Sequence, residues 1–286
     1  MSYSERFSVR PGARVRLAGL DPALKGGYES HEDVEDEIER CRKRLSELQE
    51  VLYAEQRRSL LICLQALDTG GKDGTINHVL SAMNPQGCRV SNFRQPSKEE
   101  AAHDFLWRVH RAAPARGEVV IFNRSHYEDV LITRVHNLVP KSVCSHRYDH
   151  INAFERALAD HETLILKFFL HISKKEQLAR FKARLDDPNK HWKIAEADYQ
   201  ERKFWGGYVR AYDEALSRCS TQWAPWFVIP ADHKWYRNLV VARIVVEQLE
   251  RLHLRYPKPR VNLERIRREY HAARHAAARR PSHKRS

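Results

Sequence analysis

A glycine-rich turn that joins a buried strand to a helix constrains this chain more than any other part of its sequence. An apolar strand at residues 60–64 runs into the turn at 68–75, and apolar residues at helical spacing follow directly. Backbone N–H groups of such a turn point at an anion, and Lys72 adds a full positive charge. The sequence therefore predicts a phosphate-binding loop, with these candidate contacts: Gly70, Gly71, Lys72, Asp73, Gly74 and Thr75.

This turn departs from the phosphate-binding motif G-x-x-x-x-G-K-[ST] at two positions. Ala66 replaces the first glycine, and Asp73 stands where the motif has a metal-binding hydroxyl. A carboxylate inside the turn, Asp68, would repel phosphate unless a divalent cation lies between the two groups. The residues favour a phosphate loop with its own metal arrangement, although Asp68 could also serve only as a turn or N-cap residue.

Apolar strands and helical patterns alternate along the chain. We expect strands at residues 60–64, 89–93, 119–122, 164–172 and 226–229, and helices at 30–58, 71–83, 97–110, 145–160, from 173 onward and at 239–252. Buried strands separated by helices are typical of a mostly parallel sheet covered on both faces, so we predict an α/β fold with three α/β/α layers. Such sheets bind ligands at the carboxyl ends of their strands, where residues 68–75 and 123–129 both fall.

The helix expected at residues 30–58 carries one apolar stripe. Its members recur at alternating steps of four and three residues: Val34, Ile38, Cys41, Leu45, Leu48 and Leu52. A stripe of this length is typical of a helix packed against a sheet. A contact with a second copy of the chain is the alternative.

Polar residues at positions 123–129 form the second candidate segment. Asp68 together with Glu128 or Asp129 could hold magnesium, which prefers carboxylate and phosphate oxygens. We predict Asp129 as the second ligand. Arg124 is suited to bidentate phosphate binding, although it could instead form a structural ion pair with one of the two acids.

A basic helix and the loop after it form the third candidate segment. Arg180 and Arg184 are four residues apart on one helical face, and Lys190 and Lys193 follow. A solvated charged helix is the ordinary explanation for such a run. Beside a predicted phosphate site, these cations favour a mobile lid at about residues 174–206 that closes over phosphates and excludes water.

The charge of the chain narrows the class of ligand. The 286 residues carry a net charge of +13; the segment from Lys258 onward has ten Lys/Arg and two Glu, a net +8, which leaves +5 for the rest. A basic body suits a polyanion such as a nucleotide, a nucleic acid or an inorganic phosphate polymer. Five cysteines without a C-x-x-C pair predict reduced thiols and a cytoplasmic protein. No apolar run reaches the roughly 18 residues of a membrane span, so we expect no membrane partner.

Four segments occur in order along the chain, at residues 66–75, 122–131, 185–193 and 224–232. Together they resemble the polyphosphate kinase 2 family over about residues 28–256. The resemblance implies a P-loop kinase fold similar to that of nucleoside monophosphate kinases. It also implies transfer of the terminal phosphoryl group of inorganic polyphosphate to a nucleotide, with magnesium. Asn123 followed by Glu128 and Asp129 looks like the class III pattern, whose members accept nucleoside mono- and diphosphates.

The resemblance assigns Asp68 to the metal, Lys72 and Arg124 to phosphates, and the basic segment to a lid. We therefore predict a Mg²⁺-dependent polyphosphate:AMP/ADP phosphotransferase. Its predicted catalytic residues are Asp68, Lys72, Arg124 and Glu128; its metal ligands are Asp68 and Asp129; its nucleotide contacts are Asn123, Glu128 and Lys193; and its further phosphate contacts are Arg180, Arg184 and Lys190.

We expect three parts: an N-terminal arm and helix at 1–58, a phosphotransferase domain at 59–256, and a flexible basic tail at 257–286 whose stretch 266–278 becomes helical on contact. A homo-oligomer, dimer or tetramer, is expected, without nucleic acid as a partner. Two other functions stay open. An ATP-dependent nucleotide kinase of the same fold would need a pocket for the ATP base. A basic nucleic-acid-binding protein with a vestigial phosphate loop would not need Lys72.

Overall fold

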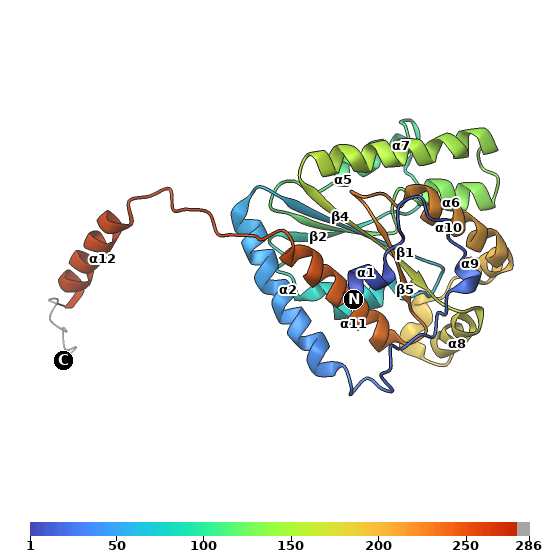
Figure 1. The fold of residues 1–286 in the computed structure, drawn as a ribbon, viewed down its shortest axis with the longest axis horizontal. Helices are drawn as coiled ribbons and strands as arrows, with labels where there is room; N and C mark the ends of the chain where they lie inside the picture. Colours follow the sequence, from blue (N-terminus) through green and yellow to red (C-terminus); the bar gives the residue numbers. More distant parts are fainter. Residues whose placement is uncertain (279–286) are drawn as a thin grey trace, which may run out of the picture. The chain divides into compact units, whose positions relative to one another are not determined.

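The computed structural model describes residues 1–278 of the chain, which forms two compact units, Met1–Arg255 and Tyr256–Ser286. The first unit contains a parallel sheet between two layers of helices (Figure 1). Its strands are β1 (Ser59–Ala66), β2 (Cys88–Asn92), β3 (Val119–Asn123), β4 (Thr163–His171) and β5 (Trp226–Pro230), in the spatial order β2-β3-β1-β4-β5. All neighbouring strands are parallel, so the predicted three-layer α/β fold is confirmed.

The central strands are mostly apolar, in keeping with the helices that cover both of their faces. Every residue of β1 is buried, and in β3 only the last residue, Asn123, is partly exposed. The register pairs Leu64 of β1 with Asn123 of β3. Strands β1 and β3 therefore end side by side, and the segments that follow them meet at one edge of the sheet.

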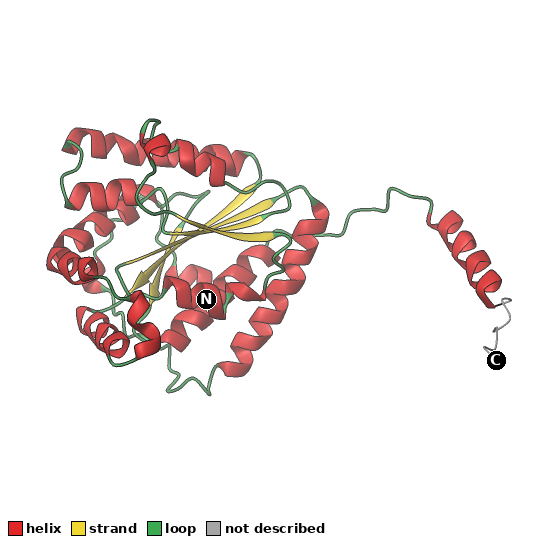
Figure 2. Cartoon of the chain, turned by 180° about the vertical axis from the view of Figure 1, so that it is seen from behind, coloured by secondary structure: helices red, strands yellow, loops and turns green. Residues whose placement is uncertain are grey.

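The helices divide between the two faces of the sheet (Figure 2). One face is covered by α1 (Tyr3–Phe7), α2 (Glu35–Glu55), α3 (Lys72–His78) and α11 (Lys234–Glu250). The other is covered by α5 (Trp107–Ala112), α6 (Glu128–Val135), α7 (Lys141–Asp160) and α10 (Trp205–Cys219). The connection from β4 to α10 contains α8 (Lys174–Leu185), a 3₁₀ turn at Pro188–Lys193, α9 (Glu196–Glu201) and a 3₁₀ turn at Arg202–Phe204. Short elements elsewhere are α4 (Lys98–Ala101) and the 3₁₀ turns Leu17–Gly19 and Leu80–Ala82.

The apolar stripe of α2 packs inside the chain. Its buried members Ile38, Cys41, Leu45, Leu48 and Leu52 are at most 8% exposed and share one core with β1 and α11. Packing against the rest of the chain therefore accounts for the whole stripe, as the first of the two interpretations predicted.

Several helices differ from the prediction. The helix expected at 97–110 is divided into α4 and α5, and in the turn between them the Asp104 side chain accepts a hydrogen bond from the backbone N–H of Leu106 at 2.9 Å. Helix α11 begins at Lys234 instead of residue 239. Its extra first turn reaches the edge of the sheet where the phosphate loop lies. Helices α6, α9 and α10 had no counterpart in the prediction.

The N-terminal arm is more ordered than its composition suggested. Ser2 and Glu5 form a capping box that starts α1. Beyond it, Ser8 pairs with Phe227 in an antiparallel bridge, and the N–H of Val9 donates to the carbonyl of Trp226 at 2.8 Å. The arm thereby covers the outer edge of β5.

The C-terminal unit contains α12 (Leu263–Ala278), which includes the stretch 266–278 that was expected to become helical on contact. Local interactions account for the helix. The Asn262 side chain accepts a hydrogen bond from the N–H of Arg265 at 3.0 Å, and Arg265 pairs with Glu269 one turn later at 2.8 Å. Within residues 1–278, none of the helices combines the length and the apolar character needed to cross a lipid bilayer.

Candidate active site

The loop after β1 owes its shape to left-handed backbone conformations. Thr69 has a φ of 62° and Gly71 a φ of 105°, and α3 starts directly after Gly71. Glycine adopts the second conformation without strain. At Gly70 an added Cβ would lie only 2.4 Å from the Cβ of Ala66. The turn therefore folds tightly back onto the end of β1 and places Lys72 at the first position of α3.

Lys72 lies over this turn, and no carboxylate pairs with its ammonium group among the described residues. Its Nζ donates a hydrogen bond to the carbonyl of Ala66 at 3.2 Å. Burial and the nearby Arg124 cation lower the pKa of Lys72, against the opposing pull of Asp68 and Glu128. A phosphate bound at the loop would raise the pKa of Lys72 again, because its negative charge favours the protonated lysine.

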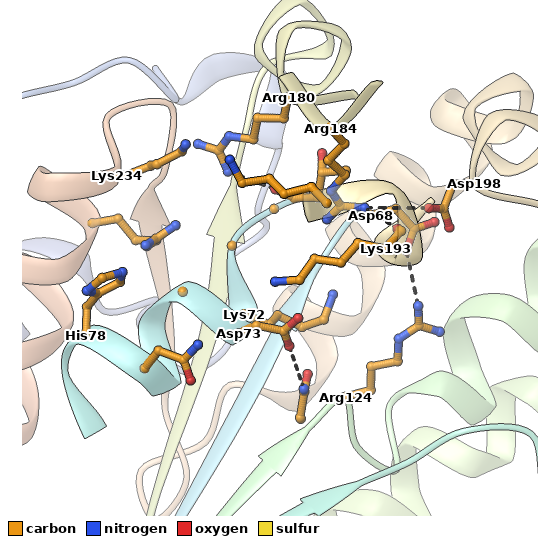
Figure 3. Close-up of a pocket in the computed structure, with 18 of the residues that line it drawn as sticks. Asp68, Lys72, Asp73, His78, Arg124, Arg180, Arg184, Lys193, Asp198 and Lys234 are labelled. Carbon is orange, nitrogen blue, oxygen red and sulfur yellow. Dashed lines mark hydrogen bonds and ion pairs between the residues drawn. The ribbon is translucent and has the colours of Figure 1, made fainter. Parts of the chain in front are cut away.

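Arg124 connects the segment after β3 to the loop after β1. Its Nη2 donates to Asp68 Oδ1 at 3.1 Å (Figure 3). Its Nη1 lies 3.9 Å from Glu128 Oε2. Arg124 has a φ of 60°, and its backbone N–H donates to the carbonyl of Leu64 at 3.1 Å. The side chain is 41% exposed and lines the pocket. Arg124 thus forms the structural ion pairs and still faces the site predicted for phosphate.

Glu128 lies behind the pocket wall. Burial raises the pKa of its carboxyl group, although Arg124 and Lys72 act in the opposite direction. The side-chain amide of Gln65 lies 3.0 Å from Glu128 Oε1. Glu128 therefore reaches the pocket through Arg124, whose orientation it helps to set.

Asp73 and Asn123 close the loop from the side of β3. The Asn123 amide donates to Asp73 Oδ1 at 2.9 Å, and both residues line the pocket (Figure 3). The departure from the phosphate-loop motif at Asp73 therefore places a second carboxylate beside Lys72. The pocket contains a third carboxylate, Asp198, contributed by α9.

Besides Glu128, two more of the predicted site residues are not brought to the pocket. Thr75 is fully buried, and its hydroxyl donates to the carbonyl of Gly71 at 3.1 Å. Asp129 lies between two arginines, 3.4 Å from Arg147 Nη1 and 3.7 Å from Arg108 Nη2. The reason is helical geometry, because the residue after Glu128 on α6 points about a quarter turn away and toward α7.

Arg180 of α8 is hydrogen-bonded to the backbone of the loop after β1. The residue is buried, its Nη1 donates to the carbonyl of Thr69 at 2.9 Å, and its Nη2 donates to the carbonyls of Ala231 and Asp232. Its Nε pairs with Glu176 at 2.7 Å. Arg180 lines the pocket, but its hydrogen bonds already connect the loop after β1 to the loop after β5.

The remaining lid cations lie on more exposed chain. Arg184 donates to the carbonyl of Lys193 at 3.0 Å and lies 3.7 Å from Asp198. Lys190 pairs with Asp187 at 2.6 Å. Lys193 lies 4.9 Å from the ring centroid of its neighbour Trp192. All three cations line the pocket with the phosphate loop, as their sequence pattern predicted.

The pocket has a volume of about 1110 Å³, above the roughly 300–1,000 Å³ of a site for one small molecule. Its wall includes residues that the sequence reasoning missed, notably Lys234, Arg237 and Asn238 on the first turns of α11. Two features of the sequence could have indicated these residues. Strand β5 must also end at the ligand edge of the sheet, and the fourth of the segments that resemble the family, residues 224–232, ends just before α11. The predicted start of α11 at residue 239 hid the connection.

A buried polar network supports the segment after β3. Glu155 accepts hydrogen bonds from Lys167 Nζ at 2.6 Å and Tyr127 Oη at 2.8 Å, and it lies 3.1 Å from His126 Nε2. All four side chains are fully buried. The network fixes the chain directly after Arg124 and so contributes to the position of that arginine.

The polar residues of the pocket suit a divalent cation that is shared with a phosphate ligand. Asp68 and Asp73 both supply carboxylate oxygens to the pocket. Magnesium is commonly bound by one or two carboxylates together with water and substrate phosphates. In the part of the chain that the structure describes, no group of three His, Cys, Asp or Glu could hold a metal alone. The residues therefore fit a cation that arrives with its phosphates.

Comparison with known proteins gives a consistent family. A sequence model described as Polyphosphate kinase 2 (PPK2) matches residues 28–257. An AMP/ADP-polyphosphate phosphotransferase of Meiothermus ruber is 49% identical over 266 residues, which cover 92% of this chain and 98% of the relative. An ADP-polyphosphate phosphotransferase of Rhodopseudomonas palustris is 43% identical over 267 residues, covering 89% and 92%.

Solved structures agree with the sequence matches. The crystal structure of Polyphosphate Kinase 2 from Arthrobacter aurescens TC1 has a TM-score of 0.90 and 42% identity to this chain, and the match covers 94% of this chain and 96% of the other. The fold is thus shared with this solved structure over nearly the whole length of both chains. The chain belongs to the polyphosphate kinase 2 family.

Proposed function

We propose that this protein is an enzyme that transfers the terminal phosphoryl group of inorganic polyphosphate to nucleoside mono- and diphosphates, forming ADP from AMP and ATP from ADP. One observation carries the proposal: a pocket in which Lys72 and Arg124 face the carboxylates of Asp68 and Asp73 beneath the basic lid. The names of the two relatives support the same substrates.

Catalysis in this proposal consists of positioning and charge neutralisation. Lys72 neutralises charge on the transferred group, and Arg124 orients the acceptor phosphate. Arg184 and Lys193 bind further phosphate oxygens when the lid, at about residues 174–206, excludes water. A general base is unnecessary, because the attacking atom is a phosphate oxygen that is already deprotonated at neutral pH.

We propose Mg²⁺ as the cofactor, held by Asp68 together with Asp73. When bound, it neutralises negative charge that the donor and acceptor phosphates share. The ion pairs of Asp129 with Arg108 and Arg147 leave that carboxylate committed elsewhere, so Asp73 takes its place in the proposal. Gly70, Gly71 and Gly74 allow phosphate to approach the backbone closely.

For the acceptor we propose contacts with Asn123 and Lys193, which line the pocket, and support from Glu128 through Arg124. All five cysteines are unpaired, and four of them are buried, which supports a reducing compartment and hence the cytoplasm. We further propose that the enzyme works as a homo-oligomer and needs neither a membrane nor nucleic acid.

The decisive experiment omits ATP. Purified protein is incubated with AMP, Mg²⁺ and long-chain polyphosphate, and the nucleotides are separated by chromatography. We expect ADP first and ATP later. Phosphorylation of AMP by ATP, but not by polyphosphate, would instead identify an ordinary nucleotide kinase. Nucleic-acid binding that persists in Lys72→Ala, with no transfer from either donor, would identify a binding protein with a vestigial loop.

A further inference from the structure

Arg237 is a buried cation beside the phosphate loop, without a counter-ion. The residue is 2% exposed. Its Nε and Nη2 donate to Asn238 Oδ1 at 3.2 and 2.8 Å, and no acidic residue among those described forms an ion pair with it. The only hydrogen bonds found for this guanidinium are thus to a neutral amide on the same helix.

Arg237 packs directly against the loop backbone. A Cβ added to Gly71 would lie 1.9 Å from Arg237 Nη1, and one added to Gly74 would lie 3.0 Å from Nη2. Two glycines of the loop therefore make room for this side chain. The bonds to Asn238 fix the plane of the guanidinium and leave Nη1 next to Gly71, on the wall of the pocket.

Such an arrangement is unfavourable while the pocket holds no anion. Buried charges in proteins are usually paired, since desolvation of an isolated ion is costly. Here burial, with the neighbouring Arg180 cation, lowers the pKa of Arg237 to about 9. An anion bound at the loop would act as the counter-ion of Arg237 and would raise the pKa of its guanidinium again.

The charges on the two sides of the loop differ. The three acidic residues of the pocket have their partners in the lid or on the Arg124 side: Asp68 bonds Arg124, Asp73 bonds Asn123, and Asp198 pairs with Arg184 at 3.7 Å. The other side is lined by basic and neutral residues of α3 and α11, namely Asn77, His78, Lys234, Trp235, Arg237 and Asn238. Figure 3 shows Lys234 and His78 on one side of Lys72, and Arg124 and Asp198 on the other.

We propose that the polyphosphate donor extends from the phosphate loop along the first turn of α11, with Arg237 and Lys234 as its binding residues. A wall without acidic side chains matches a ligand that is charged along its whole length. The Arg124 side, with its carboxylates, suits a cation and a nucleotide that ends in a neutral sugar and base. This inference rests on the proposed function. It assigns the polyphosphate donor to the α11 wall of the pocket and the nucleotide to the Arg124 wall.

The test compares Arg237→Gln and Arg237→Lys with Arg243→Gln. Arg243 is a matched control, because it lies on the same helix but pairs with Glu37 at 2.7 Å, away from the pocket. We expect Arg237→Gln to raise the KM for polyphosphate about tenfold or more and to leave the KM for AMP within about twofold. Arg237→Lys should recover part of the loss, and Arg243→Gln should match the wild type.

Direct binding separates this inference from the proposed function. Tripolyphosphate is titrated into each protein by calorimetry with Mg²⁺ and without nucleotide. Failure of the wild type to bind tripolyphosphate or to use polyphosphate would overturn the proposed function itself. Binding by the wild type and by Arg237→Gln with equal affinity would overturn only the α11 assignment, and so would a matching rise in the KM for AMP.

A purely structural role of Arg237 is distinguished by a second position. Lys234 is exposed, so Lys234→Gln should fold even if Arg237→Gln does not, as thermal melting will show. We expect Lys234→Gln to raise the KM for polyphosphate about threefold to tenfold with an unchanged melting temperature and an unchanged KM for AMP. A wild-type KM for polyphosphate in this variant would overturn the proposed track along α11.

Discussion

Lys72 and Asp68 are the two loop residues on which the proposed chemistry depends most. Lys72→Ala removes the charge at the transferred group, and Asp68→Asn removes a carboxylate that positions the metal. We expect each change to lower kcat about 10²–10³-fold with little effect on thermal melting, because both side chains lie at the pocket surface. Wild-type turnover by Asp68→Asn throughout a magnesium titration would show that Asp68 only forms the turn.

The pKa of Lys72 predicts how activity depends on pH. Burial and Arg124 lower this pKa, so the free enzyme loses the Lys72 charge at a lower pH than an ordinary lysine, whose pKa is 10.5. The value of kcat/KM, which reports the free enzyme, should fall as the pH rises toward that value. Bound phosphate favours the charged lysine, so kcat should fall only at higher pH.

The control for this profile is Lys72→Arg, since arginine keeps its charge throughout the range. Its kcat/KM should be lower than that of the wild type but flat over the same alkaline pH values. An identical alkaline fall in the wild type and Lys72→Arg would assign the titration to another group.

Glu128 should influence the choice of acceptor. Its carboxylate lies 3.9 Å from Arg124 Nη1 and helps to orient that side chain in the pocket. AMP carries one phosphate and leaves a gap that the β-phosphate of ADP would fill, so AMP depends more on this alignment. We expect Glu128→Ala to lose more activity with AMP than with ADP in parallel steady-state assays. Equal losses would leave Glu128 with a general electrostatic role.

At the scale of single elements, β4 and α7 are joined by a buried ion pair. Lys167 and Glu155 are fully buried and 2.6 Å apart. Replacing only one partner leaves an uncompensated charge, so Lys167→Met should lower the free energy of unfolding by about 3–5 kcal/mol in urea titrations. As a control, Arg156→Ala breaks the exposed ion pair between Arg156 and Asp160 on α7. It should lower the free energy of unfolding by only about 0–1 kcal/mol.

The double change Lys167→Met with Glu155→Leu completes this experiment. Removing both charges should recover much of the stability lost in Lys167→Met, because no ion is then left unpaired in the core. A loss in the double variant equal to the sum of the single losses would show that the pair does not act as a unit.

The strands and the loop were predictable because their signals are local. Continuous apolar runs gave β1 and β3, and the glycines with Lys72 gave the turn between β1 and α3. The start of α11 was not predicted, and His233 provides no side-chain cap that would mark it. The interruption at Asp104 contains a side-chain hydrogen bond, which periodicity does not reveal.

The candidate site was predictable as a set of residue types and less so as a set of contacts. Arg124 and Lys193 line the pocket as expected, whereas Asp129 pairs with arginines of α5 and α7. Sequence spacing places Glu128 and Asp129 equally near the metal, and only tertiary packing separates them. Arg237 was missed for the same reason, because its neighbours Gly71 and Gly74 lie far from it in the chain.

At the scale of the whole molecule, the basic C-terminal segment should affect capture of the donor rather than chemistry. Residues from Lys258 onward carry ten Lys/Arg against two Glu. A polycation raises the local concentration of a polyanion by screened, long-range attraction. Truncation after Tyr256 should raise the KM for long polyphosphate at low ionic strength, leave kcat unchanged and have little effect at high salt.

The chain-length dependence is the control for that truncation. Short polyphosphate has few charges to be attracted, so its KM should respond much less than that of the long chain. An unchanged KM for long polyphosphate at low salt would leave the segment with a role in solubility or in contact with another partner.

The close packing of Gly71 against Arg237 also limits how this enzyme can be altered by selection or design. A side chain at position 71 would be strained by the left-handed backbone and would have to displace the Arg237 guanidinium, whose Nη1 occupies that space. A substitution at position 71 would therefore also disturb the position of the buried cation. The loop and the start of α11, more than 150 residues apart in the chain, must therefore be inherited and redesigned together.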